Sequence, residues 1–238
     1  MGPNPVWLME LLTEAMDLRS GQRVLDLGCG RAATSIFLAR EFGVQVWATD
    51  LWINASDNWS RIEDSGLGDS VFPIHADART LPFADRFFDA IVSVDAYHYF
   101  GTDGLYLDRC VRLLRPGGQL GIVSPGLRRE LEGVRPPHLE MFEGGDLATL
   151  HTPRWWRDYW AITGHVEVLC AEPVPDASLL WRRWDAGCLG YGRATGLWPQ
   201  GPPGVGVSAG STQELRMLDQ DGGALLDLVR VVARRCSH

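Results

Sequence analysis

The stretch Val24-Leu25-Asp26-Leu27-Gly28-Cys29-Gly30-Arg31 decides the fold of this chain. Its mostly apolar first half predicts a buried β-strand, and its two glycines predict a tight turn. Residues 32–42 then read as a helix, and a strand, a Gly-rich turn and a helix together open a nucleotide-type α/β site. Asp26 stands two residues before the first glycine. A carboxylate at that point favours a ligand that carries positive charge.

The composition is that of an ordinary soluble globular chain. The 238 residues are 45% hydrophobic and carry a net charge of -8, which argues against a protein that binds nucleic acid by neutralising phosphates. No apolar run approaches the roughly 18 residues of a membrane span, and the N-terminus lacks the layout of a signal peptide. The five cysteines form no CxxC pair. These features together predict a reduced, cytoplasmic setting without a membrane partner.

Strands and helices alternate through the first half of the chain. A helix over residues 7–16 precedes the decisive stretch, and a turn at residues 115–118 (Arg-Pro-Gly-Gly) ends a helix over 105–114. Five strands joined by crossovers predict a doubly wound parallel sheet. The expected strands cover residues 24–27, 45–49, 71–75, 88–94 and 119–124.

The pattern changes after Pro125. Residues 126–150 are polar and interrupted by Pro and Gly, and a Trp-rich helix follows over 154–163. Strands are expected at 165–171 and 228–233, a helix at 175–186, a long loop at 187–210 and a final helix from Ser211. The prediction is one Rossmann-like domain over residues 1–238 with a seven-stranded, mostly parallel sheet and an antiparallel last strand. A helical lid insertion for the acceptor covers about 126–163, between core segments at about 20–125 and 164–238.

The glycine loop by itself leaves the cofactor open. Gly28-x-Gly30-x-x-Ala33 also satisfies the dinucleotide pattern, and Asp50 follows about twenty residues later. A pyrophosphate over this turn would lie near the Asp26 carboxylate, and two like charges in a partly desolvated site repel each other. S-adenosylmethionine has no phosphate but carries an ammonium and a sulfonium, which Asp26 would attract.

Five motifs in order make the chain resemble the class I S-adenosylmethionine-dependent methyltransferases, in particular the small-molecule branch with ubiquinone-biosynthesis-type enzymes. They are residues 24–30, Asp50 after the second strand, residues 76–83, residues 88–93 and residues 113–118. The resemblance covers about residues 22–124. It departs from the family at Ala32, which replaces a third glycine and is small enough to keep the turn.

The resemblance implies a set of cofactor-binding residues. Gly28 and Gly30 would let the backbone approach S-adenosylmethionine, and Asp26 would lie beneath its methionine moiety. Asp50 would accept hydrogen bonds from the ribose hydroxyls. Asp77 would take the adenine amino group. A helix cap or a turn residue is the alternative for both Asp50 and Asp77, and for Asp95, which otherwise would touch the methionine end. The full set is Asp26, Gly28, Cys29, Gly30, Asp50, Leu51, Asp77, Ala78 and Asp95.

Two histidines are the candidates for the catalytic base that takes a proton from the acceptor. His98 follows the fourth strand, so it points to the sheet edge where ligands bind, and its near-neutral pKa suits a base; packing or capping is equally plausible. His151, just before the Trp-rich helix, is the second candidate. His138 is a weaker one on the lid. No cluster of His, Cys and carboxylates has metal-ligand spacing, so we expect no metal.

The expected function is methylation of an O, N or S atom of a small-molecule acceptor, with release of S-adenosylhomocysteine. An aromatic concentration around the sixth strand suits either core packing or a pocket for a planar or apolar acceptor; it comprises Trp155, Trp156, Tyr159, Trp160, Trp181 and Trp184. The alternatives are a catalytically silent S-adenosylmethionine-binding module, a nucleic-acid methyltransferase and an NAD-dependent oxidoreductase. The acceptor and the oligomeric state cannot be read from the sequence.

Overall fold

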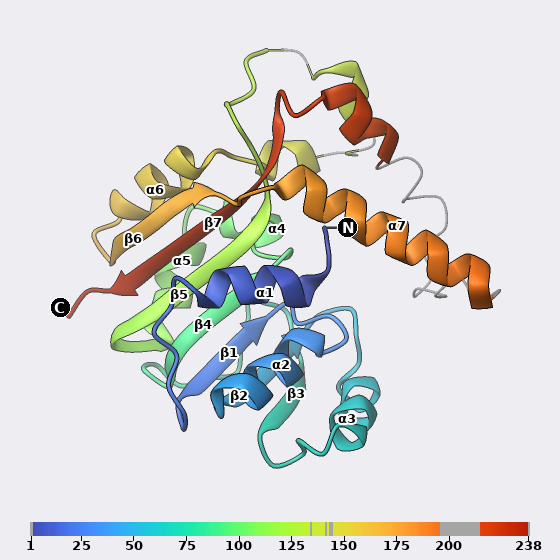
Figure 1. Ribbon diagram of the computed structural model, residues 1–238. Coiled ribbons are helices and arrows are strands. Elements are labelled where there is room, and N and C mark those ends of the chain that lie inside the picture. The colour runs from blue at the N-terminus through green and yellow to red at the C-terminus, as the bar shows by residue number, and fades with distance from the viewer. Residues whose placement is uncertain (1, 134, 141, 143–144, 196–214, 238) are drawn as a thin grey trace.

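A computed structural model describes residues 2–133, 135–140, 142, 145–195 and 215–237, with the side chains of 189–195 left out. Seven strands form one sheet in the order β3-β2-β1-β4-β5-β7-β6 (Figure 1). Neighbours among β1 to β5 pair in parallel, whereas β7 runs antiparallel to β5 and β6. The predicted fold class is confirmed. The strands are β1 (Arg23–Leu27), β2 (Gln45–Asp50), β3 (Val71–His75), β4 (Phe88–Val94), β5 (Leu114–Leu127), β6 (Val166–Pro173) and β7 (Leu226–Arg235).

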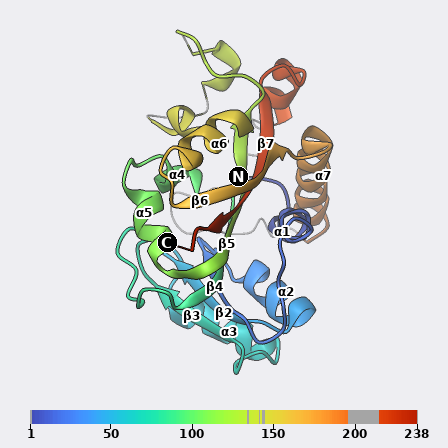
Figure 2. The ribbon, with the colours of Figure 1, turned by 90° about the vertical axis from the view of Figure 1, so that its left-hand side faces the viewer.

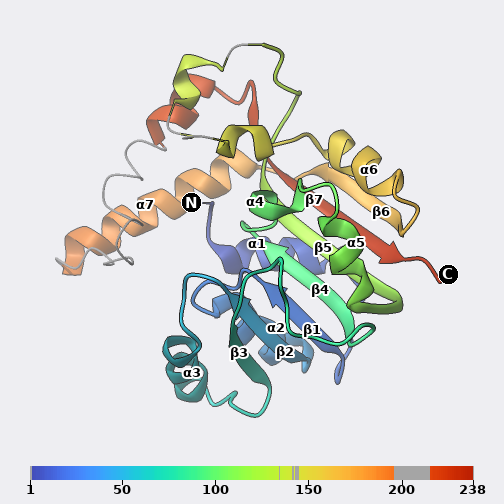
Figure 3. The ribbon, with the colours of Figure 1, turned by 180° about the vertical axis from the view of Figure 1, so that it is seen from behind.

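Helices cover both faces of the sheet (Figures 2 and 3). Side chains that alternate along a strand point to opposite faces, so Val24 packs in one apolar core and Leu25 in the other. The first core lies under α1 (Pro5–Thr13), α2 (Ala33–Phe42) and α7 (Ala177–Thr195), with α3 (Ala55–Asp64) beside β3. The second lies under α4 (His98–Gly101), α5 (Tyr106–Arg112) and α6 (Pro153–Ala161).

Three elements differ from the expected pattern. Residues 76–87 join β3 to β4 without a helix. The Pro-Gly-Gly turn lies inside β5, where the pairing with β4 shifts register between Phe88 and Ala90. The predicted loop at 187–210 is wrong for residues 187–195, which continue α7. Glycines weaken a helix by about 1 kcal/mol each but do not forbid its backbone angles. The rest of that loop and Ser211 lie outside the described residues, and 215–221 are helical as expected.

The Trp-rich helix α6 belongs to the layer that covers the sheet. Trp156 and Trp160 have no exposed surface and pack with Tyr97 at ring centroid distances of 5.8 and 5.7 Å. Core packing is therefore what the structure shows for these two tryptophans. Within residues 128–152 of the expected insertion, the described residues include two short 3-10 helices, η1 (Pro137–Leu139) and η2 (Asp146–Thr149).

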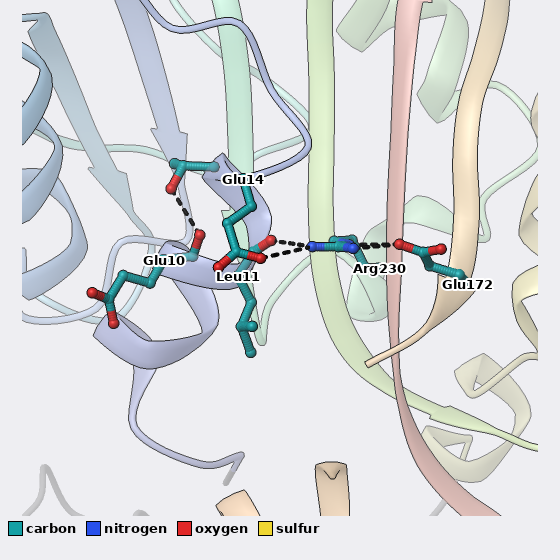
Figure 4. A network of polar contacts seen from close by, with 6 residues as sticks. Glu10, Leu11, Glu14, Glu172 and Arg230 are labelled. Carbon is teal, nitrogen blue, oxygen red and sulfur yellow. Dashed lines mark hydrogen bonds and ion pairs between the residues drawn. The ribbon is translucent and has the colours of Figure 1, made fainter. Parts of the chain in front are cut away.

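Arg230 of β7 ties the outer strands to α1 (Figure 4). Its guanidinium donates to the Glu172 carboxylate on β6 and to the Leu11 carbonyl of α1, and it lies 3.7 Å from a Glu14 oxygen. The Arg230 side chain is only 14% exposed, so these ion pairs are shielded from water more than surface pairs are. The network fixes the first helix, and with it the segment that precedes the helix, against the sheet.

A second polar pair joins two segments above the carboxyl ends of the parallel strands. We call these segments, the described parts of residues 128–152 and 215–221, the cover. His138 Nε2 lies 3.0 Å from a carboxylate oxygen of Asp221, whose other oxygen accepts from the backbone N–H groups of Leu225 and Leu226. This pair links residues 128–152 to the helical segment 215–221, and it gives His138 a carboxylate partner. In the part of the chain that the structure describes, no helix is long and apolar enough to cross a bilayer.

Candidate functional site

The glycine loop is built by backbone bonds to the next strand. The N–H groups of Gly28 and Cys29 both donate to the Thr49 carbonyl, at 2.8 and 3.0 Å. Gly28 has φ +77° and lies against Ala96, so that a Cβ added there would be 2.3 Å from the Ala96 Cβ. Gly30 has φ +54°, and nothing lies within 4 Å of an added Cβ. The first glycine is thus required by packing, and the second leaves open space in which a ligand could approach the backbone.

Ala32 occupies the position of the family's third glycine and adopts φ +61°. This left-handed conformation costs an L-residue roughly 1–2 kcal/mol. The methyl group is fully buried in the first core. The turn is therefore kept as expected, with backbone strain that a glycine would not have.

Asp50 connects the glycine loop to the β2–α3 loop. Its Oδ2 accepts from Gly30 N at 2.8 Å, and its Oδ1 accepts from Trp52 N and Ile53 N at 2.8 and 2.9 Å. A carboxylate has about four acceptor positions, so a ligand diol that donates twice must displace one of these three N–H groups. The neighbouring Leu51 side chain is 48% exposed, and its carbonyl accepts from His75 Nε2 at 2.8 Å.

Asp26 lies beneath the loop and not on its surface. The carboxylate is 1% exposed, and its Oδ2 accepts from the hydroxyls of Thr34 and Ser35 at 2.6 Å each. Burial raises the pKa of Asp26 to about 6, against the lowering effect of the two hydroxyls. These partners in the first turn of α2 were missed in the sequence, although hydroxyl residues there are a usual signal for capping. Cys29 is buried, and burial raises the pKa of its thiol.

Replacing Asp26 by asparagine tests what this carboxylate does. Asparagine keeps an oxygen for both hydroxyls and removes the buried charge, so we expect the free energy of unfolding to rise by about 1–2 kcal/mol at pH 7.5. The folded-state pKa exceeds the unfolded value of about 3.9. The native carboxyl therefore takes up its proton first as the pH falls from 6 to 4, wild-type stability recovers, and the gain shrinks. Urea unfolding of the wild type and the variant at pH 7.5 and pH 4.5 measures the stability gain at each pH.

The same variant also addresses the cofactor. If Asp26 attracts the cationic methionine end of the cofactor, the S-adenosylmethionine affinity of the Asp26→Asn variant falls about tenfold while the stability of the variant rises. An equal stability difference at both pH values would contradict the assignment of a buried, titrating carboxylate.

Asp77 and Ala78 lie in the connection to β4. Asp77 Oδ1 accepts from Arg79 N at 2.8 Å, which is the geometry expected if Asp77 is a turn residue. The Asp77 side chain is 36% exposed. The Arg79 guanidinium also reaches the Tyr99 carbonyl at 3.4 Å. Tyr99 in turn lies 6.2 Å from the ring of Trp52, which is 67% exposed. The loops after β2, β3 and β4 therefore meet at one edge, as a site for a flat ring requires.

Asp95 and His98 follow β4 on one turn of chain. Asp95 has φ +54°, and its Oδ2 accepts from Gly2 N at 2.7 Å, so the segment before α1 lies against it. The short helix α4 begins after Tyr97, whose side chain makes no capping bond. His98 is 3% exposed, and its buried Nδ1 has no hydrogen-bond partner among the residues that the structure describes. Burial lowers the pKa of His98, and the Asp95 carboxylate opposes that shift.

His151 is held by a carboxylate that the sequence did not indicate. Its Nδ1 lies 2.9 Å from Glu130 Oε2, and its ring stacks on Trp155 at 3.6 Å. Glu130 is 21 residues away in sequence and belongs to no motif, so only the fold reveals the pair. Among the described residues, no group of three or more His, Cys, Asp or Glu could hold a metal ion.

Comparison with known proteins gives matches to the segment that carries the glycine loop. Residues 24–118 match a family described as "Methyltransferase domain". The chain is 33% identical over 148 residues to methyltransferase GfsG of Streptomyces halstedii, with 62% of this chain and 51% of that protein covered. It is 35% identical over 99 residues to a fatty-acid O-methyltransferase of Mycolicibacterium smegmatis, with 41% and 35% covered. The chain spans about half, or less, of the length of these relatives.

Solved structures share the fold. Phosphoethanolamine N-methyltransferase 2 of Haemonchus contortus, in complex with S-adenosyl-L-methionine, superposes with a TM-score of 0.74 at 18% identity, covering 99% of this chain and 54% of that one. Geranyl diphosphate C-methyltransferase of Streptomyces coelicolor A3(2) gives a TM-score of 0.72 at 16% identity, with 96% and 77% covered. Residues 24–118 therefore match a methyltransferase domain, and the sheet of the whole chain has the class I S-adenosylmethionine-dependent methyltransferase fold.

Proposed function

We propose that this chain transfers a methyl group from S-adenosylmethionine to a small molecule held beneath residues 128–152. The observation that carries the proposal is His98: a polar side chain that is 3% exposed, with a buried nitrogen lacking a partner, beside Asp95 at the ligand-binding edge of the sheet. A buried polar atom without a partner is costly. An acceptor that hydrogen-bonds Nδ1 would supply the missing partner.

The residues on the donor side fit the cofactor. The open space beside Gly30 would let the cofactor approach the backbone. The Asp50 carboxylate is a hydrogen-bond acceptor, and the exposed Leu51 side chain is an apolar surface. Bound S-adenosylmethionine supplies a methyl group on a sulfonium, which an aligned nucleophile can attack. The protein's work is then to orient the acceptor, exclude water and remove a proton where the nucleophile has one.

The acceptor class follows from the relatives only as far as "small molecule". Their names include O-, N- and C-methyltransferases, acting on fatty acids, phosphoethanolamine and geranyl diphosphate. The net charge of -8 disfavours a nucleic-acid acceptor in this chain as well. The ubiquinone-type branch and a cytoplasmic location stay part of the proposal.

Binding and turnover can be measured separately. Calorimetry is expected to show binding of S-adenosylmethionine and S-adenosylhomocysteine but not of NAD. The Asp50→Ala substitution is expected to weaken S-adenosylmethionine binding about 10- to 100-fold. The acceptor panel is a long-chain fatty acid, phosphoethanolamine, geranyl diphosphate and a simple phenol, with S-adenosylhomocysteine release as the readout. Binding without release from any acceptor would favour the silent module, and tight NAD binding would overturn the cofactor assignment.

A further inference from the structure

A polar cluster at the start of α6 holds the His151 ring in one orientation. The Glu130 carboxylate lies 2.9 Å from His151 Nδ1, and it accepts from the N–H and the hydroxyl of Thr152 at 2.9 and 2.7 Å. The Trp155 ring stacks on the imidazole, with an interplanar angle of 6°. Thr152 also caps α6 by accepting from Trp155 N at 3.1 Å. One edge and one face of the imidazole are therefore fixed.

The carboxylate determines which nitrogen carries the proton. An ionised Glu130 can only accept hydrogen bonds, and its hydrogen bonds lower its pKa against the effect of burial, so it is ionised at neutral pH. His151 Nδ1 must then be the donor. The neutral ring consequently has its free lone pair on Nε2, which is the arrangement of a histidine base oriented by a carboxylate.

The cluster lies in the cover over the strand ends. The His151 carbonyl accepts from Leu127 N at 3.2 Å, at the carboxyl end of β5. The 3-10 helix η2, which ends two residues before His151, contacts α4, the helix that begins at His98. Both histidines thus belong to the same region, between residues 128–152 and the edge of the sheet.

The two histidines differ in their surroundings. His98 is 3% exposed, so that a charge there would be desolvated. The His151 side chain is 18% exposed, and a carboxylate oxygen of Glu130 lies 2.9 Å from its Nδ1. A base must be within reach of the acceptor and oriented by a neighbouring group, and this requirement favours His151.

We propose that His151 takes the proton from the acceptor nucleophile at Nε2 and that Glu130 is the positioning residue that makes this possible. The inference rests on the proposed methyl transfer and deepens it. As the bond from the acceptor atom to the methyl carbon forms, the sulfur–carbon bond breaks and its electron pair stays on sulfur. The acceptor proton goes to Nε2. The acceptor is accordingly one that loses a proton from O–H or N–H.

Glu130→Gln isolates the orientation of the ring. The glutamine oxygen can still accept from Thr152, while its amide NH₂ faces Nδ1 and favours the opposite tautomer, in which Nε2 carries the proton and cannot accept one. We expect kcat/KM with the responsive acceptor of the panel to fall about 100-fold, and S-adenosylmethionine affinity to stay within about twofold. Glu130→Asp is expected to restore part of the activity. Nitrogen-15 NMR of the imidazole is expected to show protonated Nδ1 in the wild type and protonated Nε2 in the glutamine variant.

Arg154→Ala is the matched control, because Arg154 lies on the same helix with a side chain that is 90% exposed and that pairs with Asp158 at 3.6 Å. It is expected to change the free energy of unfolding by less than about 1 kcal/mol and to leave kcat/KM close to wild type. If Arg154→Ala lowers kcat/KM as much as Glu130→Gln, or if Glu130→Gln keeps wild-type kcat/KM, the base role is overturned. A wild-type chain that releases no S-adenosylhomocysteine with any acceptor overturns the proposed function itself.

Discussion

Replacing Gly28 by alanine is expected to destabilise the protein by roughly 2–5 kcal/mol. The new Cβ would lie 2.3 Å from the Ala96 Cβ, far inside the separation of about 3.5–4.0 Å at which two carbon atoms pack. Overpacking of this kind costs about 1–3 kcal/mol. The backbone angle of φ +77° adds roughly 1–2 kcal/mol for any residue with a Cβ. The loss is a large part of the about 5–15 kcal/mol by which native domains are stable.

Gly30→Ala is the matched control for this prediction. The substitution is the same and the φ angle is again positive, but no atom lies within 4 Å of the added Cβ. We expect only the backbone cost, about 1–2 kcal/mol, together with weaker S-adenosylmethionine binding if the open space receives the cofactor. Urea unfolding of both variants is the measurement. Equal destabilisation by the two alanines would show that the Ala96 contact does not constrain the loop.

Replacing His98 by leucine is expected to lower kcat/KM by about 100- to 1,000-fold while stabilising the fold by about 1 kcal/mol. The gain arises because leucine removes a buried nitrogen that lacks a partner in the described part of the chain. The loss arises because the acceptor forfeits the group proposed to hold it in line with the methyl group. Opposite signs for stability and activity are typical of a site residue that is strained in the absence of its ligand.

His165→Ala provides the control for nonspecific effects of removing a histidine. The His165 side chain is 47% exposed, and its Nε2 lies 3.3 Å from a carboxylate oxygen of Asp108. Neither residue belongs to the proposed site. We expect its variant to keep wild-type kcat/KM. Unchanged turnover in His98→Leu, or a loss of stability larger than about 2 kcal/mol, would contradict the proposed role.

Most of the fold could be predicted because its signals are local. A buried strand, a glycine turn and a helix start each depend on neighbouring residues, and five such units in order define the sheet as far as β5. Prediction failed where local preference and tertiary context disagree. Three glycines at 187, 190 and 192 favour a loop, yet α7 continues through them to Thr195.

Asp26 has structural partners that its sequence motif does not indicate. The negative charge at position 26 predicts attraction of a cationic cofactor, whereas in the structure its carboxylate accepts hydrogen bonds from the hydroxyls of Thr34 and Ser35. Asp50, likewise, uses both oxygens to hold the two loops together. Their proposed cofactor contacts therefore have to coexist with structural bonds, which the variants above can separate.

The residue pattern alone was enough to predict the sheet, the resemblance to the methyltransferases and the proposed donor residues. These depend on short motifs whose geometry is set by backbone conformation close in sequence. The contacts between residues far apart in the sequence were decided only in three dimensions. Glu130 meets His151, Gly2 meets Asp95 and His138 meets Asp221 across 21, 93 and 83 residues, respectively. Side chains on separate loops are brought together by the packing of the whole domain, and no spacing along the chain encodes which of them will face each other.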